Sequence, residues 1–98
     1  MSRFWVDETF AIESRRLFVL AGEIADGQIQ AGMIVSVPLN SSLSISGPVH
    51  SIEYARRTGG REDVCLCIAY ADSDELGLWK SLDLRNETVE VQPAAHVI

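Results

Sequence analysis

The feature that most constrains this chain is a series of short alternating runs, each ended by residues that favour turns. The runs lie at 17–24, 33–39, 43–45, 49–55, 64–70 and 88–91. Residues 17–24 are apolar at odd and even positions alike, which is typical of a strand covered on both faces. Residues 64–70 place the two cysteines on one face and larger apolar side chains on the other. Short strands bounded by turns predict a β-barrel or a sandwich.

Three glycines, Gly22, Gly27 and Gly32, separate or interrupt these runs at strand-sized intervals. A tightly curved sheet needs glycine where it kinks, where a turn has positive φ, or where two strands approach closely. The pair Asp26-Gly27 favours a tight hairpin turn. We therefore predict an all-β fold, a small closed or nearly closed antiparallel barrel of the Greek-key kind.

The pair Gly47-Pro48 is predicted to end the short strand at 43–45, because proline donates no ladder hydrogen bond. The run that follows it, 49–55, then places His50 and Ile52 on one face of the next strand. This register makes His50 a half-buried packing residue.

One segment has helical periodicity instead. Asp72 is a suitable N-cap with Glu75 three residues later, and Leu76, Trp79 and Leu82 recur at helical spacing. A short helix near 73–82 is predicted, weakened by its internal glycine. Over 98 residues the sequence predicts a single domain, 1–98, with barrel strands at about 9–71, the helical turn and a last strand at 72–92, and a tail at 93–98.

Trp5 and Trp79 fall outside the predicted barrel strands. Tryptophan is enriched at protein interfaces, where its large ring contributes much contact area. The same side chain can also cover the open end of a barrel. The sequence leaves both interpretations open.

The sequence holds few residues that suggest metal or thiol chemistry. Cys65 and Cys67 lie about 6.5–7 Å apart at Cα in one strand, a spacing that strains a mutual disulfide. With no other cysteine in the chain, a reducing cytoplasmic location is expected. His50 and His96 complete a possible zinc ligand set, but the spacing matches no usual zinc module. We predict structural cysteines, no metal and no cofactor.

No constellation of residues predicts an enzyme. The acids at 62–63 and 72–75 lie in predicted loops, where solvated carboxylates are the default. A calcium loop starting at Asp72 fails because Leu76 and Leu78 occupy ligand positions. With only two histidines, no nucleophile, base and orienting group are brought together by any recognisable motif.

The candidate binding residues are the arginines and glycines of a predicted hairpin tip: Arg56, Arg57, Gly59, Gly60 and Arg61. Guanidinium groups clamp phosphate or carboxylate, and glycine amides add donors. The alternative is a solvated tip whose arginines pair with Glu62 and Asp63. A net charge of −6 disfavours DNA, RNA and anionic membranes as partners, and no uncharged stretch is long enough to span a membrane.

Several runs together resemble the β-barrel second domain of translational GTPases, the barrel that follows the GTP-binding domain in elongation factor Tu and its relatives. The runs are 18–24, 26–29, 31–37, 49–54 and 60–68. Gly60 lies one residue too far from Val64, and the segment around Trp79 has no counterpart. Because the chain has no Gly-x-x-x-x-Gly-Lys-Ser/Thr loop, the resemblance implies a barrel that stands alone and is not a GTPase.

The resemblance also implies a possible ligand, since the family's barrel helps to hold the aminoacyl end of transfer RNA. If the strands pair as in the family, Arg15 and Arg16 lie near the loop at 56–61. No contact residue of the family is carried over to this chain. We predict a non-catalytic binding module whose partner is another protein or a second copy. Recognition of an RNA end or nucleotide is the alternative, and a small enzyme the third.

Overall fold

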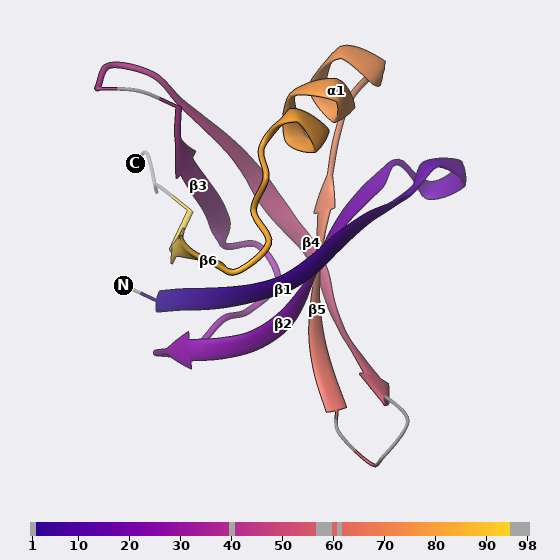
Figure 1. Ribbon diagram of the computed structural model, residues 1–98, viewed down its shortest axis with the longest axis vertical. Helices are drawn as coiled ribbons and strands as arrows, with labels where there is room; N and C mark the ends of the chain where they lie inside the picture. Colours follow the sequence, from indigo (N-terminus) through magenta and orange to yellow (C-terminus); the bar gives the residue numbers. More distant parts are fainter. Residues whose placement is uncertain (1, 40, 57–59, 61, 95–98) are drawn as a thin grey trace.

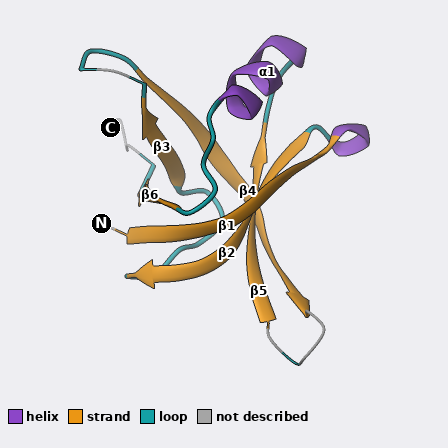
Figure 2. Cartoon of the chain, viewed as in Figure 1, coloured by secondary structure: helices purple, strands orange, loops and turns teal. Residues whose placement is uncertain are grey.

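The alternating runs form six antiparallel strands that close into a barrel in the order β1-β2-β5-β4-β3-β6 (Figures 1 and 2). The computed structural model describes residues 2–39, 41–56, 60 and 62–94. The elements are β1 (Ser2–Ile12), the 3-10 turn η1 (Glu13–Arg15), β2 (Leu17–Asp26), β3 (Ile34–Pro38), β4 (Ser44–Arg56), β5 (Glu62–Ala69), α1 (Ser73–Ser81) and β6 (Glu87–Gln92). A closed antiparallel barrel with one short helix is therefore confirmed.

The barrel extends beyond the predicted range of 9–71 at both ends. β1 already begins at Ser2, and β6 closes the barrel by pairing with β1 on one side and β3 on the other. The early part of β1 is hard to recognise because its register shifts between Val6 and Glu8, so its alternation is interrupted. β6 is short and comes after the helix in the sequence. The sequence pattern therefore does not indicate that this strand belongs to the barrel.

The predicted end of a strand at Gly47-Pro48 is wrong, because β4 is one continuous strand of 13 residues that includes both. Proline is tolerated there: Pro48 is exposed, and it pairs with Ile34 at the start of β3. A register shift between Val49 and Ser51 of β4 lies at His50, which is exposed. That bulge separates His50 from the face of Ile52, so the predicted shared face and the half-buried histidine are both wrong.

The buried side chains form two clusters. The larger fills the barrel and includes Phe4, Phe18, Leu20, Val35, Val49, Leu66, Ile68, Val91 and Trp79 of α1. The smaller lies on the other face of β2 and β5 and consists of Leu17, Val19, Ala21, Cys65 and Cys67. β2 is therefore buried on both faces from Leu17 to Gly22. Glu23 and Ile24, at the end of the run predicted to be covered on both faces, are exposed.

α1 begins where its cap predicts. The Asp72 side chain accepts a hydrogen bond from the Glu75 backbone amide at 2.9 Å, and the Glu75 carboxylate accepts one from the Ala71 amide at 3.1 Å. α1 lies beside one end of the strands (Figure 1). Its buried residues, Leu76 and Trp79, belong to the cluster that fills the barrel. No helix in the described part of the chain is long and apolar enough to cross a membrane.

The two tryptophans have different surroundings. Trp79 is completely buried, and its ring stacks on Phe18 at a centroid distance of 5.9 Å. It therefore covers one end of the barrel interior, one of the two interpretations that the sequence left open. Trp5 is half-buried in β1, and its indole nitrogen donates a hydrogen bond to Asp7 at 3.1 Å.

The three singled-out glycines occupy two kinds of position. Gly27 and Gly32 have φ values of +74° and +94° in the connection from β2 to β3. Gly22 has no positive φ, but a Cβ there would overlap the carbonyl oxygen of Trp5 in β1. The tight hairpin expected at Asp26-Gly27 is not formed, because β5 and β4 separate β2 from β3 in the barrel.

Candidate binding groove between β3 and β6

The barrel wall opens between β3 and β6. β3 pairs with β4 along its whole length, but its pairing with β6 is confined to Ile34, Val35 and Ser36. On the other side, Glu87 to Val89 pair with β1 alone. Pro38, which lacks a backbone N–H, helps to end the ladder here. Two strand edges therefore diverge without a common ladder.

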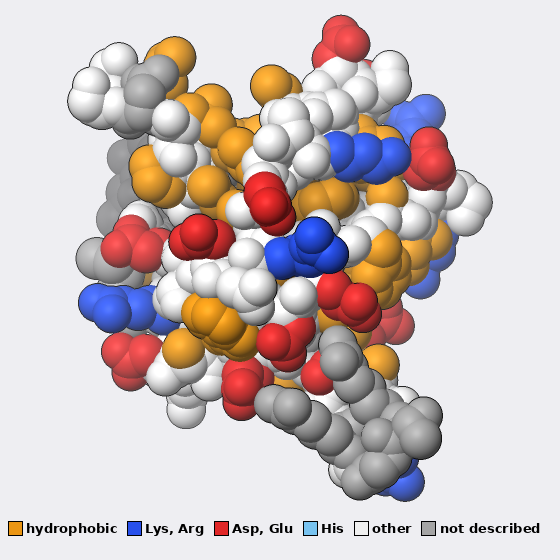
Figure 3. Space-filling model, viewed as in Figure 1, with side chains coloured by type: hydrophobic (Ala, Val, Ile, Leu, Met, Phe, Trp, Pro, Cys, Tyr) orange, Lys and Arg blue, Asp and Glu red, His pale blue; other side chains and the backbone are white. Residues whose placement is uncertain are grey.

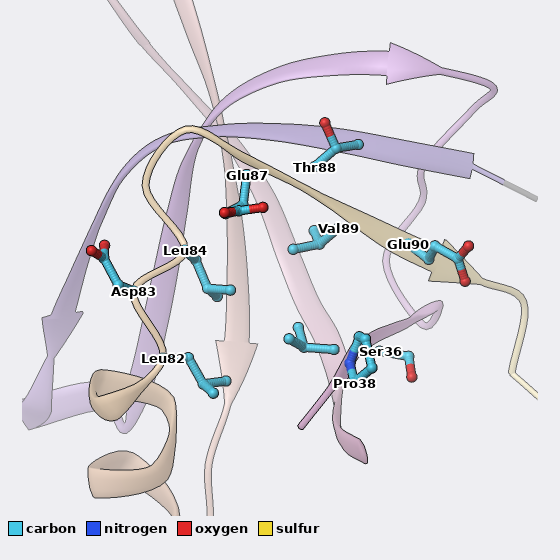
Figure 4. Close-up of a pocket in the computed structure, with 10 residues that line it drawn as sticks. Ser36, Pro38, Leu82, Asp83, Leu84, Glu87, Thr88, Val89 and Glu90 are labelled. Atoms are coloured by element: carbon cyan, nitrogen blue, oxygen red, sulfur yellow. The ribbon is translucent and has the colours of Figure 1, made fainter. Parts of the chain in front are cut away.

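A pocket of about 480 Å³ occupies the space between these edges (Figure 4). That volume lies within the range of pockets that hold ligands. Its floor is apolar: Val37, Leu84 and Val89 are buried, and Leu82 is half-buried. Ser36, Pro38 and Thr88 add to the lining. We call this pocket the β3–β6 groove.

Acidic side chains surround the apolar floor. Asp83, Glu87 and Glu90 all line the groove and are exposed. Arg85 approaches Asp83 at 3.8 Å, but both side chains are largely exposed, so this ion pair contributes little. Acidic side chains also lie among the apolar ones over the face of the molecule seen in Figure 3. The groove therefore suits a group that is cationic at one end and apolar along its length.

The arginine loop predicted as the binding site is only partly described. Arg56 is exposed at the end of β4, opposite Glu62, and Gly60 has a φ of +83°. Arg57, Gly59 and Arg61 lie outside the described residues.

The expectation that Arg15 and Arg16 lie near this loop is wrong. The strand that follows them enters the ladder at Leu17, opposite Ala69, whereas Arg56 pairs with Glu62 at the other end of β5. The two ends of β5 are about 23 Å apart at the usual strand rise. Arg15 and Arg16 therefore lie far from Arg56.

Both cysteines are buried in the smaller cluster, and neither forms a disulfide in the described structure. Burial raises the pKa of the Cys67 thiol, and the carboxylate of Glu53, which accepts a hydrogen bond from its Sγ at 3.4 Å, adds to the increase. His50 is exposed in the β4 bulge, and His96 lies outside the described residues. Within the described ranges, no group of three or more His, Cys, Asp or Glu side chains could hold a metal ion.

The raised thiol pKa predicts how stability depends on pH. Because the folded state favours the neutral thiol, the unfolded state loses this proton first as the pH rises. The contribution of Cys67 should be fully present below about pH 8.5 and should decline as the pH rises through the unfolded and then the folded pKa. Urea unfolding of the wild type at pH 7–10 should show this decline. The Cys67→Ala variant should lose stability less steeply, and identical slopes would contradict the assignment.

A second pocket, of about 340 Å³, lies beside the start of α1. Two bonds join its walls: Arg16 donates to the Ala71 carbonyl at 3.5 Å, and the Tyr70 amide donates to the Arg16 carbonyl at 3.1 Å. They hold the β1–β2 turn against the segment that leads into α1, which is a structural role.

Sequence reasoning missed the β3–β6 groove. The only signal was the mixture of acidic and apolar residues at 82–90, which is also ordinary for a surface segment. Nothing in the sequence indicates that this segment faces the end of β3. Comparisons of the chain with protein-family models, curated proteins and solved structures gave no match.

Proposed function

We propose that this chain is a non-catalytic interaction module, similar to the barrels of translation factors, that binds another protein through the β3–β6 groove. The observation that carries the proposal is the gap in the barrel wall beyond Ser36, where the β3–β6 ladder ends and an apolar floor lies between the two strand edges. Exposed strand edges are places where proteins bind extended segments of their partners. We place the module in the cytosol, in keeping with two cysteines that form no disulfide in the described structure.

Protein is favoured over RNA because of charge. A net charge of −6 and three acids around the groove oppose the approach of a polyanion. Arg15 and Arg16 lie far from Arg56 along β5, so they do not enlarge a basic surface there. Recognition of an RNA end by the loop at 56–61 is the second candidate.

Site-specific photocrosslinking tests this proposal. A benzoylphenylalanine residue at Thr88, an exposed position that lines the groove, should form a discrete protein adduct in the native cytosol. The matched control carries the same residue at Tyr54, which is 64% exposed on β4. We expect an adduct from Thr88 that does not form from Tyr54.

Two results would contradict the proposal. Equal adducts from both positions would mean that the groove has no special role. An adduct that forms only from Tyr54 and shifts in mobility after ribonuclease treatment would favour the RNA alternative.

A further inference from the structure

We infer that the β3–β6 groove holds an extended peptide segment of a partner protein, with an arginine or lysine side chain lying across its apolar floor. This inference rests on the proposed function, because it names the chemistry of the partner that the groove would bind. The geometry of the strand edges, the composition of the floor and the charge of the rim each support it.

The strand edges favour an extended backbone. Beyond Ser36, β3 no longer pairs with β6, whereas β6 stays paired with β1 at Glu87 to Val89. An extended segment is the form of polypeptide that matches such an edge, because its own N–H and C=O groups are free to bond along it. Pro38 donates no hydrogen bond, and the Glu87 amide already donates to the Leu84 carbonyl at 3.1 Å, so the incoming backbone would bond to β6 beyond Glu87.

The floor and rim favour a long cationic side chain. Leu82, Leu84 and Val89 offer apolar surface, and Glu87 rises from the adjoining edge of β6 (Figure 4). Arginine and lysine carry an apolar stem with a charged head, so one side chain can cover the leucines and reach a carboxylate. Arginine adds the geometry for two parallel hydrogen bonds to a carboxylate. A purely apolar ligand would offer no charged group to pair with the carboxylates of the rim.

The rim charge excludes the opposite class of ligand. A phosphate or an acidic peptide would meet Asp83, Glu87 and Glu90. These acids outnumber their two basic neighbours in the described structure, Arg85 beside Asp83 and Arg3 opposite Glu90 in the β1–β6 ladder. Like charges brought together across an interface disfavour binding, so the same rim that attracts a cationic segment rejects an anionic one. The groove is therefore expected to select by charge as well as by shape.

The test uses three capped peptides of alternating sequence. One alternates valine with arginine, the second replaces each arginine by uncharged citrulline of the same shape, and the third replaces it by glutamate. Spermine serves as a cation without a peptide backbone. Binding to the complete chain is measured by fluorescence anisotropy, and the contacted residues are located by NMR shifts. We expect only the arginine peptide to bind, with shifts concentrated at 36–38 and 82–90.

Matched variants then test the rim. Glu87→Gln combined with Glu90→Gln should weaken the arginine peptide by about tenfold, the loss expected for charge-assisted hydrogen bonds. The control, Glu13→Gln combined with Glu62→Gln, removes the same charge at two exposed positions outside the groove and should change affinity less than twofold. Equal weakening by both pairs, or spermine binding as tightly as the peptide, would overturn the inference.

The outcome is separable from that of the proposed function. The arginine peptide should also compete with the Thr88 adduct. A Thr88 adduct that persists when the peptide fails to bind would leave the module a protein binder and refute the cationic segment. Peptide binding that depends on Glu87 and Glu90, without any adduct from Thr88, would support the chemistry of the groove and contradict the proposed protein partner in the native cytosol.

Discussion

Replacing Gly22 by alanine or valine is expected to destabilise the barrel by about 3 kcal/mol or more, a cost at the upper end for overpacked sites. A single added Cβ would overlap the Trp5 carbonyl oxygen and lie 3.1 Å from the Asp7 amide nitrogen. Both are backbone atoms of a paired strand, so they cannot rotate away. Because the Cβ itself causes the overlap, alanine should be nearly as harmful as valine. Urea unfolding followed by circular dichroism measures the loss.

Substitutions at two other glycines serve as controls for the steric cost at Gly22. Gly32→Val should cost only about 1–3 kcal/mol, from backbone strain at a φ of +94°, because nothing lies within 4 Å of its added Cβ. Gly77→Ala, in an exposed helical turn that is equally open, should stabilise the protein by about 1 kcal/mol. A Gly22→Ala variant as stable as the wild type would show that β1 and β2 are paired in another register.

Truncating Trp79 to alanine is expected to cost about 3–5 kcal/mol, a large part of the stability of a small domain. The ring is completely buried at the barrel end, against Phe18 and beside Ile68 and Gly47. Its removal would leave a cavity that rigid strands cannot fill. Circular dichroism during urea unfolding is the suitable measurement, because the substitution also removes a fluorophore.

Trp79→Phe is the matched control. In the described structure, the Trp79 indole nitrogen is buried without a hydrogen-bond partner, so losing it removes no bond and relieves an unsatisfied donor. Phenylalanine keeps most of the apolar contact with Phe18. We expect it to cost much less than alanine. Equal losses for the two substitutions would mean that the ring contributes little packing and that the helix position matters instead.

Gly47 is the residue that makes room for this ring. A Cβ there would lie 2.6 Å from Ile68 and 2.9 Å from Trp79. The sequence marks Gly47-Pro48 as the end of a strand, because these two residue types usually interrupt pairing. The tertiary structure uses them differently: the glycine admits a helix side chain, and the proline lies exposed in an unbroken strand.

The sequence by itself determined the features that depend on neighbouring residues. Alternation over 17–24 and 64–70 indicated strands, and the apolar character of both faces of 17–24 indicated a strand buried on both sides. Asp72 and Glu75 located the start of the helix, because an N-cap and its reciprocal acid act over only a few residues. The barrel class followed from the number and brevity of the strands.

Only the tertiary structure decided what depends on pairing between distant segments. The bulges after Val6 and beside His50 shift register without a local sequence mark, so they changed which side chains share a face. The β3–β6 groove exists because two strands from distant parts of the chain are neighbours for only part of their length. Strand order and register are set by the closure of the whole barrel and its common core, and no single run of residues carries that information.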